Sequence, residues 1–297
     1  MEKMSFLNRD VTTTLKGVAV LLVMLQHAGA FGFGNIIFAP FGGIGVAIFL
    51  FLSGFGLTES YKLQGLTLFW KKKMLRILVP YIMWLPIYYL MCQTDFPSLP
   101  TKGSFPLYWF INYLLIWYVV FYISLRFFRQ YAMYMMMLAS IALFFLFPST
   151  LQAEQSLSFI SGVFVSFHWK RFVRINTFHS LLVASLLLLL GVAILGVKQF
   201  PEVRVMDVNN VIMKLLNLVM KYSAGLSLIV LGALYLRGRV LVVGTIGMMS
   251  YELYLVHQPF YESILHNWLT LLVFIVQSFV LAYVLFLLDR KAISIWK

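Results

Sequence analysis

Two residues that acid–base chemistry uses stand inside the first long apolar run of the sequence, 15–33. His27 follows Lys16 by eleven positions, and eleven helical steps of about 100° return to within about 20° of the starting direction. On a helix, both side chains therefore project from one face, with His27 about 18 Å from the start of the run. An imidazole can serve as a general base, although the pair also fits an interhelical hydrogen bond and an interfacial anchor.

A second histidine, His257, follows Glu252 and Tyr254 in an apolar run near the C-terminus. Tyr254 and His257 share a helix face at a spacing of three, and Pro259 predicts a distortion of that helix. Glu252 lies about 140° around the helix from His257, which argues against a direct pair. These residues fit either the support of a second substrate or a core histidine with satisfied hydrogen bonds.

Four cations stand within six residues, at Lys71, Lys72, Lys73 and Arg76, and the last two share a helix face. A cluster of this kind at a helix start suits a polyphosphate, because helix N-termini and basic side chains both favour one. It equally suits an anchor to anionic lipid headgroups. Near the end of the second apolar run, Ser53 places a hydroxyl before a glycine, where side chain and exposed backbone could bind a carbonyl or a phosphate.

The elements that position these residues must lie in a membrane. The 297 residues are 62 % hydrophobic and 11 % charged, with a mean hydropathy of +0.90. A soluble domain carries about 25 % charge, so the soluble, disordered and fibrous classes are excluded. Lipid permits only helices or closed barrels, and the apolar runs are long rather than alternating. The sequence therefore predicts an all-α, polytopic integral membrane protein.

Ten apolar runs approach the roughly 20 residues that a span requires. We expect them to form one transmembrane domain over residues 1–297, because the loops are too short for a separate soluble domain. The predicted spans are 15–33, 38–57, 74–92, 106–125, 131–148, 157–169, 178–197, 211–236, 241–265 and 268–288.

The basic residues support this count. With both termini cytoplasmic, 18 of the 23 lysines and arginines fall on the inner side and three on the outer side, while Lys214 and Lys221 fall in the outer part of the eighth span. This asymmetry follows the positive-inside rule. The net charge of +13 is therefore mostly a topological signal, and no nucleic-acid partner is expected.

Taken in order, these segments resemble the acyltransferase-3 family of membrane O-acyltransferases, in the short form without an attached extracytoplasmic domain. The resembling segments are Lys16 to His27, Gly45-Val46 to Ser53-Gly54-Phe55, Lys73 to Arg76 with Pro80-Tyr81, Tyr108-Trp109-Phe110, and Ser250-Tyr251 to His257. Two features depart from the family pattern. Thr13 stands where the family has an acid, which leaves the partner of Lys16 unidentified, and Lys16 and Lys73 replace arginines, which removes the planar guanidinium fork.

The resemblance implies transfer of an acyl group, usually acetyl, from cytoplasmic acyl-CoA (acetyl-CoA) to a hydroxyl of a cell-envelope glycan or its lipid-linked precursor, in the plasma (inner) membrane. It implies His27 as general base, Lys16 as orienting group for the donor and His257 as support for the acceptor. The expected coenzyme A site consists of Lys71, Lys72, Lys73, Arg76 and Ser53. The expected acceptor site consists of Trp109, Tyr254 and Glu252. With Cys92 as the one cysteine, a cysteine-rich metal cluster is excluded and no metal is expected.

Two other functions fit a multispan chain with deep histidines. A proton-coupled transporter or flippase would use such residues, but the two halves show no matching pair of broken helices. A glycan polymerase or ligase would need a long outer loop, and the sequence has none.

Overall fold

The computed structural model describes residues 7–92, 108–147, 150–172, 176–236, 238, 240–258, 260 and 267–295. In these ranges the regular structure is helical throughout, which confirms the predicted all-α class. The longer helices are α1 (Arg9–Gln26), α2 (Ala39–Gln64), α3 (Phe69–Cys92), α4 (Trp109–Phe127), α5 (Ala132–Leu146), α7 (Ser156–Phe172), α8 (Thr177–Val197), α10 (Val211–Tyr235) and α13 (Trp268–Ile295). The shorter ones are η1 (His27–Gly32), η2 (Ile36–Phe38), η4 (Arg129–Tyr131), α6 (Thr150–Ala153), α9 (Pro201–Arg204), α11 (Leu241–Met248) and α12 (Ser250–Val256).

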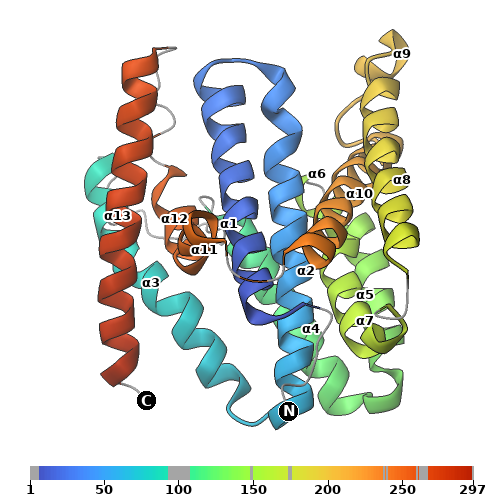
Figure 1. The fold of residues 1–297 in the computed structure, drawn as a ribbon, viewed down its shortest axis with the longest axis horizontal. Coiled ribbons are helices and arrows are strands. Elements are labelled where there is room, and N and C mark those ends of the chain that lie inside the picture. Colours follow the sequence, from blue (N-terminus) through green and yellow to red (C-terminus); the bar gives the residue numbers. More distant parts are fainter. Residues whose placement is uncertain are drawn as a thin grey trace.

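Seven helical segments in the described ranges are long and apolar enough to cross a bilayer. They coincide with seven of the ten predicted spans: the first, second, fourth, fifth, seventh, eighth and tenth. The predicted third span is α3, which begins with the basic cluster, and the predicted sixth is α7, which has only 17 residues. The first turn of α1 and the last turn of α13 point to the same lower edge of the bundle in Figure 1, as an even number of crossings requires. The count of ten and the cytoplasmic termini stay predictions.

The predicted ninth span is not one continuous helix. Its described part forms α11 and α12, which are separated by Met249 at φ −109° and ψ 22°. Close packing accounts for the position of α11: a Cβ atom added at Gly247 would lie 1.8 Å from the carbonyl oxygen of Thr13 in α1. Pro259, at which the sequence predicts a distortion, lies outside the described residues. The run 241–265 is therefore interrupted at Met249, and the distortion at Pro259 stays a prediction.

A pair of antiparallel helices, α1 and α2, forms the centre of the bundle (Figure 1). Gly45 allows this approach, because an added Cβ would lie 2.4 Å from the carbonyl oxygen of Ala19. The absence of a side chain at Gly45 thus serves helix packing. Gly54 does the same against Phe159 of α7, at 2.1 Å from the carbonyl oxygen. Gly54 is buried, so the predicted exposed backbone beside Ser53 is wrong.

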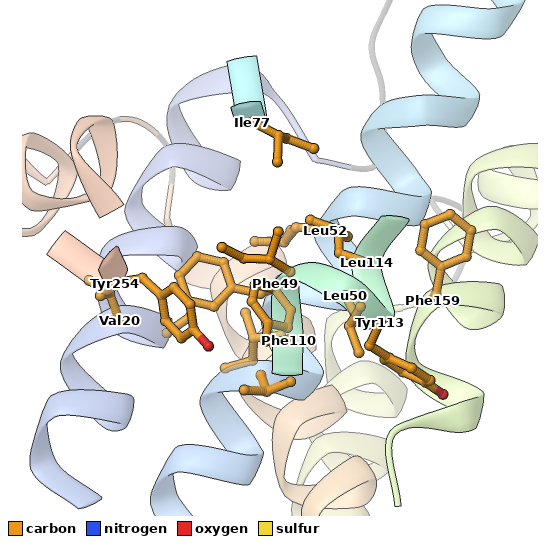
Figure 2. Packing of buried hydrophobic residues seen from close by; sticks show 14 of the residues in the cluster. Val20, Phe49, Leu50, Leu52, Ile77, Phe110, Tyr113, Leu114, Phe159 and Tyr254 are labelled. Atoms are coloured by element: carbon orange, nitrogen blue, oxygen red, sulfur yellow. The ribbon is translucent and has the colours of Figure 1, made fainter. Parts of the chain in front are cut away.

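Aromatic packing and hydrogen bonds fix α12 against α3 and α4. The Tyr108 hydroxyl donates to the carbonyl oxygen of Leu255 at 2.7 Å and accepts from Nε1 of Trp84 at 2.8 Å. Figure 2 shows Phe110 beside Phe49 and Tyr254, with ring centroids 6.0 and 5.2 Å away. The buried hydroxyl of Tyr108 is thus paired on both sides, and such pairing favours one arrangement of α3, α4 and α12.

Candidate active site

The two histidines singled out in the sequence are in direct contact. Nδ1 of His27 lies 2.6 Å from Nε2 of His257, and the rings stack with their centroids 4.8 Å apart at 20°. His257 has no exposed surface and His27 is partly exposed. The two imidazoles therefore form one unit, which we call the histidine pair.

Hydrogen bonding assigns the protons of this pair. Nδ1 of His257 lies 2.9 Å from the carbonyl oxygen of Leu253, and a carbonyl oxygen only accepts, so this nitrogen carries the proton. In a neutral ring, Nε2 of His257 then accepts from Nδ1 of His27. The proton on Nδ1 leaves Nε2 of His27 as the nitrogen with a lone pair, which is the form that a general base requires.

Local backbone features hold both rings. His27 opens the π-helical segment η1 directly after the regular helix α1, and π-helical turns often occur at functional sites because they redirect side chains. His257 caps the C-terminus of α12, where its backbone N–H bonds to the carbonyl of Leu253. His257, just beyond the end of α12, thus meets His27 at the start of η1.

The two aromatic residues predicted for the acceptor site lie at different distances from the histidine pair. The ring of Tyr254 lies 5.8 Å from the ring of His257, centroid to centroid. Trp109 contacts Phe110 at 6.3 Å, and Phe110 in turn contacts Tyr254. Tyr254 is therefore a direct neighbour of the histidine pair, whereas Trp109 reaches it through Phe110, which belongs to the same resembling segment as Trp109.

Three of the predicted cations lie close together at the end of the bundle that we expect to face the cytoplasm. Burial and the positive charges of Arg76, Lys16 and Lys72 lower the pKa of Lys73, which precedes the apolar part of α3, to about 8. Lys16 has an exposed surface, whereas Leu15 and Gly17 beside it are buried. We call Lys16, Lys73 and Arg76 the inner cation cluster.

The remaining residues predicted to bind the coenzyme lie around this cluster. The hydroxyl of Ser53 lies near that of Tyr118, and Arg76 is close enough for its charge to act on Tyr118. Lys72 donates to the side-chain oxygen of Gln64, and Lys71 is exposed. Tyr118 is a site neighbour that the sequence did not reveal, since it is one aromatic residue among many in α4.

The acceptor role of Glu252 stays a prediction. Its carboxyl is buried and lies near Asp289 of α13 and near Lys16. Thr13, at the position where the family has an acid, donates instead to the backbone oxygen of Arg9 at 2.8 Å. Glu252 is therefore an acidic residue near Lys16, although no ion pair joins the two in the described part of the chain. Asp289, which the sequence did not single out either, was detectable as an acid directly after an apolar run.

Comparison with known proteins gives one match. The family model described as an acyltransferase domain, acyltransferase-3, covers residues 13–288. Neither the curated proteins nor the solved structures contain a match. The matched range is nearly the whole chain and includes the histidine pair and the inner cation cluster. The chain therefore belongs to the acyltransferase-3 family of membrane acyltransferases.

Proposed function

We propose that this acyltransferase is an O-acetyltransferase that moves an acetyl group from cytoplasmic acetyl-CoA to a hydroxyl of a cell-envelope glycan or its lipid-linked precursor. The observation that carries the proposal is the 2.6 Å contact between His27 and His257. It provides a basic nitrogen whose tautomer is fixed by a second residue, which is the arrangement that activation of a hydroxyl needs.

In the proposed reaction, Nε2 of His27 accepts the proton of the acceptor hydroxyl. The oxygen of that hydroxyl attacks the carbonyl carbon of the thioester. The carbon–sulfur bond then breaks, and its electron pair leaves with the sulfur of coenzyme A. The proton on His27 passes to this thiolate, so the enzyme returns to its starting state. His257 acts as a positioning residue, because it holds the His27 ring through Nδ1.

The inner cation cluster supports the choice of donor. Coenzyme A carries phosphates at one end and the thioester at the other, joined by an extended arm. Lys16 and His27 are eleven residues apart along α1, which corresponds to about 17 Å, and such an arm bridges this separation. The cations would bind the phosphates, Ser53 and Tyr118 would line the start of the arm, and Lys16 would orient the donor.

The acceptor would approach from the opposite, outer side. Tyr254 adjoins the histidine pair and offers an aromatic face, and Trp109 lies one ring further away. Aromatic faces pack against the apolar face of a sugar while leaving its hydroxyls accessible. Tyr254 is thus the proposed contact for the sugar that carries the reacting hydroxyl.

The test compares the envelope glycans of cells with and without this protein by mass spectrometry. We expect a shift of one acetyl mass on a defined sugar, and its loss in cells that produce His27→Ala. Coenzyme A binding and membrane insertion of the variant are measured in parallel. Full acetylation by a correctly inserted His27→Ala protein would overturn the proposal.

A further inference from the structure

The short helix α12 ends in a buried stretch, and this end carries His257. Leu253, Leu255, Val256 and His257 have no exposed surface. The last carbonyl groups of a helix have no partner within the helix, and at a buried end bulk water does not reach them. These carbonyls therefore need other donors, and the donors that they find determine where the end of α12, and with it His257, lies.

Two carbonyls at this end have donors in the structure. The carbonyl oxygen of Leu253 accepts from the backbone N–H of His257 at 3.2 Å and contacts Nδ1 of its ring at 2.9 Å. The carbonyl oxygen of Leu255 accepts from the hydroxyl of Tyr108 at 2.7 Å, although 147 residues separate the two along the chain. The end of α12 is thus held by His257 itself and by a side chain from another part of the bundle.

Tyr108 is in turn held by its own neighbours. Its hydroxyl accepts from Nε1 of Trp84 in α3 at 2.8 Å, and an indole N–H only donates, so the hydroxyl proton is left for Leu255. The backbone oxygen of Tyr108 accepts from the N–H of Ile111 in the first turn of α4 at 2.9 Å. The ring of Tyr108 also contacts that of Tyr254, with centroids 6.2 Å apart. One side chain therefore links α3, α4 and α12.

His257 follows Leu255 by two residues and transmits this position to His27. The carbonyl of Leu253 fixes the proton on Nδ1 of His257, and Nε2 of the same ring then accepts from Nδ1 of His27 at 2.6 Å. Hydrogen bonds weaken steeply as their angle departs from linearity. A displacement of the end of α12 would therefore alter the hydrogen bond that orients the proposed general base.

We infer that Tyr108 is a positioning residue for the histidine pair: its hydroxyl holds the carbonyl of Leu255 and thereby the ring of His257 against His27. Loss of this hydroxyl leaves a buried carbonyl without its donor, which is costly and favours a shift of the end of α12. Tyr108 acts through His257 and needs no contact with either substrate. Its effect on acetyl transfer rests on the proposed function, whereas its effect on the hydrogen bonds of the histidine rings does not.

The first test is NMR spectroscopy of the full-length chain in detergent, with isotope-labelled histidine. The ring N–H signal of His257 is assigned by its absence in His257→Gln. Tyr108→Phe removes a single oxygen atom and should shift this signal, whereas Tyr108→4-aminophenylalanine keeps a donor at the same place and should leave it near the wild-type position. The matched control is Tyr113→Phe, in a buried tyrosine of α4 whose ring packs on Trp117 and Phe147, which should not shift it.

The second test is the kinetics of acetyl transfer. We expect Tyr108→Phe to lower kcat by about tenfold or more with an unchanged KM for acetyl-CoA, because the inner cation cluster is not affected. In a His257→Ala background the same change should lower kcat much less, since the two residues act as one unit. Tyr113→Phe should retain the wild-type kcat, and the thermal midpoint of each variant is measured in parallel.

An unchanged His257 signal in Tyr108→Phe would overturn the inference, and so would a shifted signal in Tyr108→4-aminophenylalanine, which decides the question even where Tyr108→Phe does not fold. An equal loss of kcat with and without His257 would also overturn it. If the signal responds as expected while the wild-type protein transfers no acetyl group, the proposed function fails and the positioning role stands.

Discussion

Nδ1 of His27 and Nε2 of His257 lie 2.6 Å apart although 230 residues separate them along the chain. This contact joins the first transmembrane helix to the short helix α12, and it places the acceptor nitrogen of one ring against the donor of the other. The second histidine therefore acts on the first, and its contribution to catalysis is to fix the proton and orientation of His27.

The first prediction concerns His257. We expect His257→Ala to lower kcat by about 10²-fold with little change in KM for acetyl-CoA, because the ring of His27 loses its acceptor while the inner cation cluster is untouched. His257→Gln should retain more activity than His257→Ala, since its side-chain oxygen can accept the same hydrogen bond. Steady-state kinetics, together with the thermal midpoint of each variant, check this. Equal loss in both variants at equal stability would argue against a positioning role.

The second prediction concerns the inner cation cluster. Arg76→Gln is expected to weaken coenzyme A binding by about tenfold or more, because one charged hydrogen bond to phosphate contributes roughly 1.5–3 kcal/mol. The matched control is Arg126→Gln, which removes an exposed inner charge at the end of α4 and should bind coenzyme A normally. Isothermal titration with coenzyme A at two salt concentrations measures both. An unchanged dissociation constant in Arg76→Gln would exclude Arg76 from the donor site.

The sequence predicted what depends on residue type and depth. Apolar run lengths identified the helices, and the rarity of ionisable groups in a membrane identified His27, His257 and the inner cations. It could not predict contacts that depend on how helices pack. The carbonyl of Thr13 approaches Gly247, two residues before the break between α11 and α12, and Glu252 lies near Lys16 because α12 packs on α1. Neither of these two contacts can be derived from the spacing of residues in the sequence alone.

The third prediction is a pH dependence. Burial and neighbouring cations lower the pKa of Lys73 to about 8, so its charge is lost as the pH rises through that value, and only the charged form attracts phosphate. Coenzyme A affinity should therefore fall between about pH 7 and 9. Lys73→Arg should flatten this part of the profile, since a guanidinium stays charged. Binding titrations across this range are the measurement, and an identical slope in the wild type and Lys73→Arg would assign the titration to another group.

The fourth prediction tests the helix packing that holds the site. An added Cβ at Gly45 would lie 2.4 Å from the carbonyl oxygen of Ala19, whereas at Gly56 of the same helix it would meet nothing within 4 Å. Gly45→Ala should therefore separate α1 from α2 and destabilise the protein by about 1–3 kcal/mol. Gly56→Ala should be neutral or stabilising by about 0.5–1 kcal/mol, because alanine favours a helix interior. Thermal unfolding in detergent compares the two, and equal midpoints would show that α1 and α2 do not pack this closely.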